Sequence, residues 1–233
     1  MTRALPDAEQ SENYFTDQEV VDAVAAIGRG GLVLLKGDIG YGLFGITEEA
    51  LRRMYRIKGR PYSNPCIVIA DMDVLDEVAL IPDRRIREWI AGTAAWTTLA
   101  VVLPANPDSR LLSRLPDWVR GQTVTNGTVA AFLNPGPYLQ RVMAHARERE
   151  ILFVGSSANP SSHGNIYELS EIPRQIVDAV DFHIDHGKSK HANPERKATT
   201  ILNFTNWTVK RRGVNWERIE ASFLQLKEDL QNA

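Results

Sequence analysis

Short apolar runs alternate with segments of helical periodicity along most of the chain, and this alternation restricts the folds that the sequence can adopt. The apolar runs lie at 32–35, 66–70, 99–103, 129–133, 151–154 and 199–204, and a last short strand is expected at 207–210. Helical patterns lie near 86–91, 138–149 and 167–180. Strands interleaved with helices predict an α/β fold, and we expect a mixed sheet because not every connection is long enough for a parallel crossover.

Composition and charge limit what such a chain can do. The 233 residues are 43% hydrophobic and 24% charged, which suits one sizeable core in a single domain. The formal charge of −2 gives no overall attraction for nucleic acid or anionic lipid, so any anion must be bound by a local site. The single cysteine, Cys66, excludes an intrachain disulfide and indicates a buried strand position. No window approaches the ~18 consecutive apolar residues of a membrane helix, and we expect a soluble cytoplasmic protein with no membrane contact.

The two ends of the chain differ from its middle. Residues 1–14 are polar and aperiodic and predict a flexible tail, 15–216 form the main domain, and 217–233 are expected to form a C-terminal helix that packs on it. The first helix of the main domain begins with a predicted capping box, in which Thr16 and Glu19 each bond the other's backbone N–H group.

A glycine-rich segment, Lys36–Gly42, directly follows the first apolar run. The strand before it, the helix that begins at Thr47 and the strand at 66–70 together predict a βαβ unit. Glycines after a buried strand let the backbone approach a ligand closely, which makes this segment a candidate cradle. A plain tight turn explains the same glycines equally well.

Two cations separated by one glycine form a sharper signal at Lys58 and Arg60. A lysine at the C-terminus of a helix is already explained by the helix dipole. The second cation, stiffened by Pro61, changes the interpretation because a point charge beside a planar guanidinium suits a polyphosphate. Asn64 and Pro65 then lead the chain into the next strand, which would hold this pair at the edge of the sheet.

Small hydroxyl and amide side chains crowd the end of the apolar run at 151–154. Ser156, Ser157 and Asn159 follow it, at the position where open α/β sheets bind ligands. A turn rich in serine and asparagine is the alternative interpretation. His183, His186 and His191 lie close together in the sequence, but their spacing fits no standard zinc pattern.

Taken in order, these pieces resemble the YrdC family, whose best-known members are the threonylcarbamoyl-AMP synthases. The resemblance covers roughly 17–214. It is carried by Lys58–Pro61 with Asn64 and Pro65, Ser157–Asn159, Asp185 with Gly187, Thr199–Ile201 and Arg211–Gly213. It implies a YrdC-like mixed, twisted open sheet with flanking helices and a deep basic concavity.

The resemblance also implies a reaction. L-Threonine or a related small amine and bicarbonate would attack ATP, with Mg²⁺ as companion ion, releasing pyrophosphate and leaving threonylcarbamoyl-AMP for transfer to a tRNA adenosine. The implied partners are tRNA or a tRNA-modification complex, with double-stranded RNA binding. Lys58 and Arg60 would hold the triphosphate and stabilise charge on the leaving pyrophosphate. The implied nucleotide-binding set is Lys58, Arg60, Asn64, Ser157, Asn159, Thr200, Arg211 and Arg212, and the implied substrate-binding set is Lys36, Asp38, Tyr41, Ser156 and Ser157.

Three departures from the family pattern fall around the implied sites of the acceptor amino acid and of part of the nucleotide. The synthases carry two threonines after the first strand, and both are missing from Lys36–Leu43. Their Trp-Pro-Gly-Pro-x-Thr stretch is replaced at 95–100, and an arginine expected in a later strand falls on Phe132 or a near neighbour within 129–133. The pattern that starts at Lys36 is more similar to the YrdC-like domain of carbamoyltransferases, which make carbamoyl-adenylate from carbamoyl phosphate and ATP.

Three hypotheses therefore stay open. The chain is a synthase acting on threonine or a related amino acid, an adenylate-forming enzyme that uses another amine or carbamoyl phosphate in a specialised pathway, or a non-catalytic protein that binds RNA or a nucleotide. The dependence of pyrophosphate release on each substrate separates them, and salt-sensitive RNA binding without turnover would favour the third.

Overall fold

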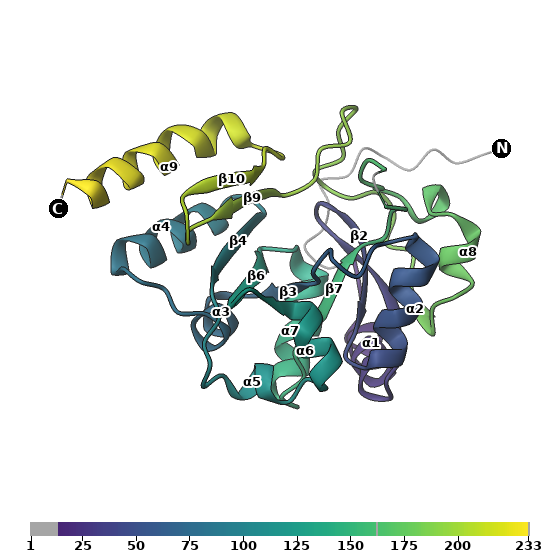
Figure 1. The fold of residues 1–233 in the computed structure, drawn as a ribbon. Helices are drawn as coiled ribbons and strands as arrows, with labels where there is room; N and C mark the ends of the chain where they lie inside the picture. Colours follow the sequence, from purple (N-terminus) through teal and green to yellow (C-terminus); the bar gives the residue numbers. More distant parts are fainter. Residues whose placement is uncertain (1–13, 162, 233) are drawn as a thin grey trace.

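A computed structural model describes residues 14–161 and 163–232 (Figure 1). Most of the expected N-terminal tail, 1–14, lies outside the described residues. The strands are β1 (Val33–Gly37), β2 (Gly40–Gly45), β3 (Ile67–Ala70), β4 (Leu99–Pro104), β5 (Val124–Thr125), β6 (Thr128–Leu133), β7 (Val154–Ser157), β8 (Phe182–His183), β9 (Thr200–Asn203) and β10 (Thr208–Arg211).

The helices flank this sheet and vary in length. They are α1 (Asp17–Gly28), α2 (Glu48–Lys58), α3 (Met72–Val78), α4 (Arg84–Ala94), α5 (Arg110–Ser113), α6 (Asp117–Thr123), α7 (Pro137–Arg147), α8 (Arg174–Val177) and α9 (Trp216–Gln231), with a 3-10 turn at Leu169–Glu171. The capping box at the start of α1 is present as predicted, with Thr16 and Glu19 bonding each other's backbone. The prediction of one helix over 167–180 is wrong. Only the 3-10 turn and the short α8 form there, because Pro173 lies between them and cannot continue a helix from the preceding turn.

The sheet is mixed, which confirms the predicted α/β class. Its strand order is β10-β9-β4-β6-β3-β7-β2-β1-β8, with β5 paired to β6. Parallel pairs join β1 to β8, β3 to β6 and β4 to β9, whereas the remaining neighbours are antiparallel.

The glycine-rich segment is a tight β-hairpin. Strands β1 and β2 pair antiparallel from Val33↔Phe44 to Gly37↔Gly40, so Asp38 and Ile39 form the turn. The predicted βαβ unit therefore starts at β2. Because β7 is antiparallel to both β2 and β3, those two strands run parallel, with α2 as their connection and β7 between them.

Strand β7 begins later than the sequence indicated. The apolar run at 151–154 was expected to be the strand, but β7 covers Val154–Ser157 and places both serines within the ladder. Ser157 lies opposite Gly42, and Ser156 lies opposite Leu43. The hydrogen-bonded ladder to β2 therefore fixes the serines as rigidly as any sheet residue.

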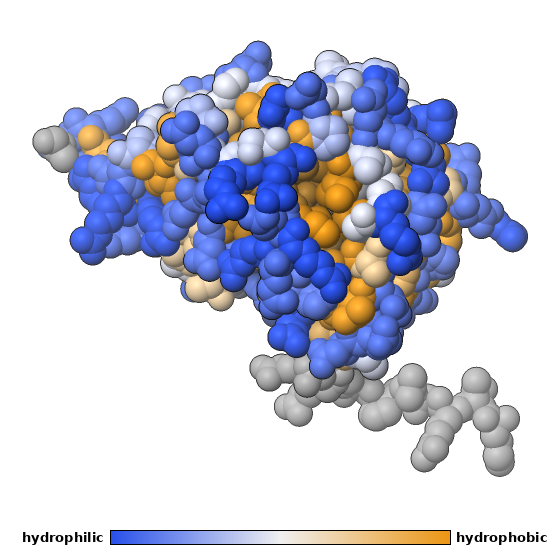
Figure 2. Space-filling view, turned by 90° about the horizontal axis from the view of Figure 1, so that it is seen from below, coloured by the Kyte–Doolittle hydropathy of each residue, from blue (hydrophilic) through white to orange (hydrophobic). Residues whose placement is uncertain are grey.

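One continuous core supports the whole described structure. At one end of the sheet α1 packs on α7 beside β1, and at the other end α9 lies along α4 (Figure 1). Trp89 of α4 packs against Phe223 of α9, with ring centroids 5.9 Å apart. Hydrophilic residues cover most of the face seen in Figure 2, and hydrophobic residues show in a hollow between them. Among the described helices, none has both the length and the apolar character needed to cross a bilayer.

Candidate functional site

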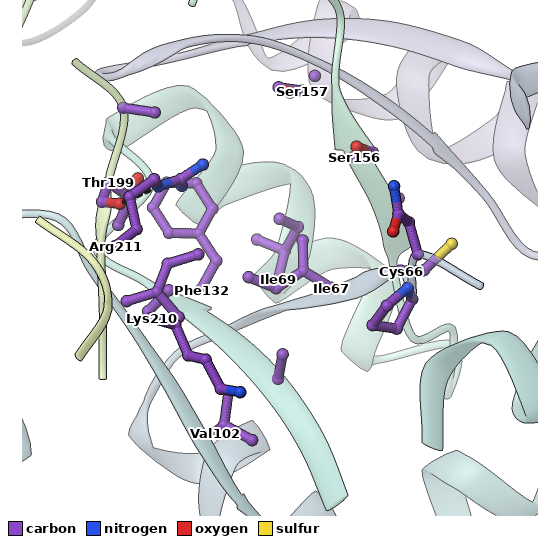
Figure 3. A pocket seen from close by; sticks show the side chains of 18 of the residues that line it. Cys66, Ile67, Ile69, Val102, Phe132, Ser156, Ser157, Thr199, Lys210 and Arg211 are labelled. Carbon is purple, nitrogen blue, oxygen red and sulfur yellow. Dashed lines mark hydrogen bonds between the residues drawn. The ribbon is translucent and has the colours of Figure 1, made fainter. Parts of the chain in front are cut away.

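A cavity of about 700 Å³ lies against the sheet and is lined by residues of every strand from β2 across to β10 (Figure 3). Cavities of this size suit small-molecule ligands. Figure 3 shows Ser156, Ser157 and Cys66 on one side of it and Thr199, Lys210 and Arg211 on the other, with Ile67 and Ile69 between them. The cavity therefore has two polar sides and an apolar middle.

The first side, here called the polar end, is formed by Arg60, Asn64, Ser156, Ser157 and Asn165. Backbone also contributes, because Gly40 and Gly42 of β2 line the same region. A side chain on Gly40 would lie 2.7 Å from both Asn165 Nδ2 and Ile166 O, so glycine is required where these groups approach the strand. The polar end thus combines a guanidinium, hydroxyls, amides and an open strip of backbone.

The middle of the cavity, here called the apolar floor, is formed by Ile67, Ile69, Ala100, Val102, Ala130, Phe132 and Ile201. Sheet register explains why these side chains share one face. Ile69 lies opposite Phe132, Phe132 opposite Ala100, and Ala100 opposite Ile201. Residues two positions away on the same strands face the same way.

The second side, here called the far wall, is formed by Thr199, Asn203, Lys210 and Arg211. Arg211 Nε donates to Thr199 O at 2.8 Å, which holds the guanidinium against the cavity. The side chain remains accessible to solvent, yet surrounding protein desolvates it enough to lower its pKa. That combination is expected of a cation inside a concave site.

Lys58 is buried beside the polar end and does not line the cavity. Its side chain reaches β7, where Nζ donates to Ser156 Oγ at 2.9 Å and to Ser157 O. The backbone completes the link, because Ser161 N donates to Lys58 O at 3.0 Å. These hydrogen bonds link the C-terminus of α2 to β7 and to the loop that follows β7.

Gly59 allows the Lys58 side chain to point toward β7 and the Arg60 side chain to point into the cavity. It has a φ of 59°, and the N–H groups of Gly59 and Arg60 bond to Arg56 O and Tyr55 O, which is a Schellman ending of α2. The chain reverses at this residue. As a result Arg60 turns to the cavity, where its guanidinium donates to Pro65 O at 2.7 Å.

Burial changes the proton affinity of Lys58. The side chain is almost wholly enclosed, which disfavours its charged form, and the positive charge of Arg60 acts in the same direction. Together they lower the pKa of Lys58 to about 7. A bound anion near this amine would favour the protonated form.

Three other predicted nucleotide-binding residues lie outside the cavity lining. Asn159 Nδ2 donates to His163 O at 2.6 Å, so its side chain shapes the loop after β7. Thr200 is fully buried, and its hydroxyl donates to Val214 O and accepts from Gly213 N. Arg212 lies over the Trp216 ring on the surface. Thr199 and Arg211, their neighbours, are the residues that reach the cavity.

The predicted substrate residues at the hairpin lie close together in the structure. Tyr41 lines the cavity, whereas Lys36 and Asp38 do not. Lys36 Nζ donates to His186 O at 2.8 Å and lies over the Tyr14 ring. Asp38 sits in the hairpin turn, and burial raises the pKa of its carboxyl. Tyr41 lines the cavity, but its hydroxyl lies 3.2 Å from Asp185 Oδ1, on the other side of the strand.

Sequence reasoning missed Asn165, Asn203 and Lys210. Asn165 comes from an irregular segment six residues after the Ser157–Asn159 motif, and its side chain donates to Ile39 O. Asn203 lies on a predicted strand two residues from Ile201, so strand alternation could have indicated that the two share a face. Lys210 could not be found in this way, because it is adjacent to Arg211 and reaches the same cavity through an irregularity in the pairing between Val209 and Arg211.

Charge in the cavity is one-sided. Among the described lining residues Arg60, Lys210 and Arg211 are cationic, and there is no aspartate, glutamate or histidine. The described residues also contain no group of three or more side chains suited to holding a metal ion. Cys66 is buried as predicted but lies just before β3 rather than within it, and burial raises the pKa of its thiol, which is therefore held neutral.

The comparison with known families gives one match over most of the chain. The sequence model of the Sua5/YciO/YrdC family, described as "Telomere recombination", matches residues 25–213. The chain belongs to this family. The resemblance to the YrdC proteins predicted from the motifs is thereby confirmed.

Relatives within the Sua5/YciO/YrdC family are distant in sequence. This chain is 24% identical over 205 residues to the threonylcarbamoyl-AMP synthase of Pseudoalteromonas translucida (strain TAC 125), covering 84% of this chain and 99% of that one. P. abyssi Sua5 complexed with L-threonine has a TM-score of 0.68 at 22% identity, covering 85% of this chain and 55% of Sua5. This chain thus spans about half of the Sua5 chain.

HypF, solved in a phosphate- and nucleotide-bound form, shares the fold. Its TM-score is 0.59 at 18% identity, and the match covers 80% of this chain and 27% of HypF. At these identities the solved structures of the family show the fold alone, and the predicted YrdC-like architecture is confirmed.

Proposed function

We propose that this chain is an ATP-dependent, adenylate-forming enzyme that makes threonylcarbamoyl-AMP or a related carbamoyl-AMP and releases pyrophosphate. The observation that carries the proposal is the hydrogen bond from Lys58 to Ser156 at the polar end of a cationic cavity. It brings the Lys-x-Arg and serine motifs to one place. Family membership and the synthase relative from P. translucida support the same chemistry.

Attack on a phosphate needs positioning and positive charge more than it needs an acid or base. Arg60 presents a guanidinium directly to the cavity, and Lys58 adds a buried positive charge behind Ser156 and Ser157. Under the proposal these groups hold the triphosphate and stabilise charge on the leaving pyrophosphate. The amine reacts with bicarbonate to give a carbamate, whose oxygen attacks the α-phosphorus of ATP.

Mg²⁺ is proposed to enter with ATP. The described cavity residues offer hydroxyl and amide oxygens but no carboxylate, so they fit an ion whose charge is balanced by phosphate oxygens. Asn64 and Ser157 would contact the nucleotide at the polar end under this proposal, while Thr199 and Arg211 lie together on the far wall. Asn159, Thr200 and Arg212 would act by shaping the loops that hold the lining residues.

Carbamoyl phosphate as the donor is the second candidate. The cavity is cationic, lacks acidic groups among its described residues and lacks the family threonines, which suits a doubly anionic donor. Transfer to a tRNA adenosine in the cytoplasm remains part of the first candidate. Among the described lining residues no aromatic ring other than Tyr41, Phe44 and Phe132 is available for stacking on a base, which gives little support to RNA binding as the main role.

The test is substrate-dependent pyrophosphate release. Pure protein is incubated with ATP, Mg²⁺ and bicarbonate plus one amino acid at a time, or with ATP, Mg²⁺ and carbamoyl phosphate. Release that needs both bicarbonate and an amino acid supports the first candidate, and release with carbamoyl phosphate alone supports the second. Silence with every substrate, together with salt-sensitive RNA binding, contradicts the proposal.

A further inference from the structure

The apolar floor offers a surface that a polar amino acid does not need. Its side chains run in two rows across the sheet, the first from Ile69 through Phe132 and Ala100 to Ile201. The second contains Ile67, Ala130 and Val102, two residues away on the same strands. Alanines at 100 and 130 leave room between larger neighbours, so the floor can accept an apolar group of a ligand.

Phe132 is the decisive residue of this floor. It stands within the stretch 129–133 where the YrdC resemblance places an arginine, and the lining residues of that stretch bring no charge to the centre of the cavity. A hydroxyl placed on the floor would meet no hydrogen-bonding side chain in the first row until Arg211, which lies opposite Ile201, and none in the second row until Asn203 of the far wall, which lies opposite Val102. Burying a hydroxyl without a partner is unfavourable, so the floor discriminates against a polar side chain.

Charge on the lining restricts the rest of the ligand. With Arg60 at one end, Lys210 and Arg211 at the other and no acidic residue among the described lining residues, a free ammonium group has no partner. A carboxylate fits the far wall. An amine fits once it has become a carbamate, because the conversion of R–NH₃⁺ and HCO₃⁻ to R–NH–COO⁻ releases water and one proton and leaves a second anionic group.

A purine base is less suited to the floor. Its edges need hydrogen-bonding partners, and the cavity provides Thr125, Asn126 and Thr128 at another corner for that purpose. Amide side chains are well matched to adenine edges. The nucleoside and an apolar side chain can therefore occupy different parts of the same cavity.

We infer that the amino acid carbamoylated by this chain is an apolar L-amino acid, with its side chain on the apolar floor and its carboxylate on the far wall. The inference rests on the proposed function and names the substrate class of the same site. Its carbamate oxygen forms the new bond to the α-phosphorus of ATP, and the bond from that phosphorus to the pyrophosphate oxygen breaks. Phe132 is the specificity-determining residue.

L-Valine and L-threonine provide the matched test, because they have nearly the same shape and differ by a methyl and a hydroxyl. Pyrophosphate release is measured with ATP, Mg²⁺, bicarbonate and valine, leucine or threonine. We expect kcat/KM for valine or leucine to exceed that for threonine by about 10-fold to 100-fold, the range in which an apolar pocket rejects a hydroxyl isostere. Turnover with threonine at least as fast as with either apolar amino acid overturns the inference and leaves the proposed function standing.

Two variants tie the preference to the floor. Phe132→Arg is expected to lower the apolar-to-threonine ratio at least about 10-fold, whereas Phe132→Leu is expected to keep it above about 10-fold. Ile201→Thr, a change between β-branched residues that suits a strand, is the second probe and should lower the ratio about threefold even where Phe132→Arg folds poorly. Circular dichroism checks that each variant is folded.

The remaining outcomes are separated by binding of a non-hydrolysable ATP analogue. If these variants weaken analogue binding and leave the amino-acid ratio unchanged, the floor holds the base and the inference is wrong. If the analogue binds but no amino acid supports turnover, both the inference and the acceptor half of the proposed function fail. If the analogue does not bind, the nucleotide half fails, and the inference falls with it.

Discussion

Lys58 Nζ lies 2.9 Å from Ser156 Oγ, and this hydrogen bond joins two motifs that are 98 residues apart in the sequence. This hydrogen bond lies beside Arg60 at the polar end of the cavity. A phosphate bound to Arg60 and Ser157 is therefore also close to the charge on Lys58.

Lys58→Ala is expected to lower ATP-dependent turnover about 100- to 1,000-fold, the usual cost of removing one charge-stabilising contact. The variant should stay folded but lose about 1 to 3 kcal/mol of unfolding free energy, because Ser156 Oγ and Ser157 O lose their donor. Turnover is followed by pyrophosphate release and stability by urea unfolding. Arg56→Ala, on the exposed side of the same helix end, is the control, and turnover equal in the two variants contradicts the assignment.

Affinity for an ATP analogue should fall as the pH rises above 7. In the free protein the pKa of Lys58 is lowered to about 7, so its charge is present below that value and is lost above it. Anion binding favours the protonated amine, and the affinity is therefore full below pH 7 and decreases toward pH 9. Calorimetry over this range measures the effect, and Lys58→Gln should remove the decrease. A wild-type profile identical to that of Lys58→Gln would show that Lys58 does not sense the anion.

Arg60→Ala is expected to reduce kcat/KM about 100-fold or more, because the guanidinium faces the cavity and would contact the leaving pyrophosphate. Stability should change little, since among the described residues the side-chain hydrogen bonds lost are those to Asn64 O and Pro65 O at an exposed site. Steady-state kinetics with varied ATP gives the result. Activity within threefold of the wild type would contradict a role for this side chain in binding the triphosphate.

Gly59→Ala should destabilise the protein by about 1 kcal/mol, because residue 59 has a φ of 59° that a side chain opposes. No atom lies within 4 Å of the position that an added Cβ would take, so backbone strain is the only cost. Gly92→Ala is the opposite case. It lies in α4 with open space around it and should stabilise the protein by roughly 0.5 to 1 kcal/mol. Urea unfolding measures both changes, and equal signs would contradict the argument.

Thr200→Val tests whether Thr200 acts through structure. Its hydroxyl bonds Val214 O at 3.1 Å and Gly213 N at 3.0 Å, so the substitution leaves two buried backbone groups without partners. We expect a loss of about 2 to 3 kcal/mol of unfolding free energy, and much less for Thr200→Ser, which keeps the hydroxyl. Stability of Thr200→Val equal to that of the wild type would contradict a structural role for the hydroxyl.

Much of the fold could be predicted because local patterns and the final structure agree. The capping box at Thr16 and the apolar runs of β3, β4 and β6 each depend on a few neighbouring residues. The turn at Asp38 and Ile39 was harder to predict. The glycines on both sides of it serve close approaches by residues distant in sequence as well as the turn itself, because Pro135 O approaches Gly37 and Asn165 and Ile166 approach Gly40. The late start of β7 follows from pairing with β2, which no local pattern shows.

The site could be predicted as a set of motifs but not as a geometry. The sequence places Lys58 and Arg60 together, whereas the structure separates them at Gly59 into a buried side chain and a cavity side chain. It names Thr200, yet Thr199 faces the cavity, because strand alternation sends the two hydroxyls to opposite sides. The substitution at Phe132 was visible in the sequence, but its partners Ile69 and Ala100 became evident only from sheet register.

Transfer of carbon from bicarbonate to a nucleotide tests the central claim most directly. Protein is incubated with ATP, Mg²⁺, ¹³C-bicarbonate and a mixture of valine, leucine and threonine, and the products are resolved by mass spectrometry. The account predicts an amino-acid carbamoyl-AMP that carries one ¹³C atom and forms together with pyrophosphate, and it predicts that Lys58→Ala reduces both products in parallel. Pyrophosphate or AMP formed without label in any adenylate, or no nucleotide product from protein that binds ATP, would contradict it.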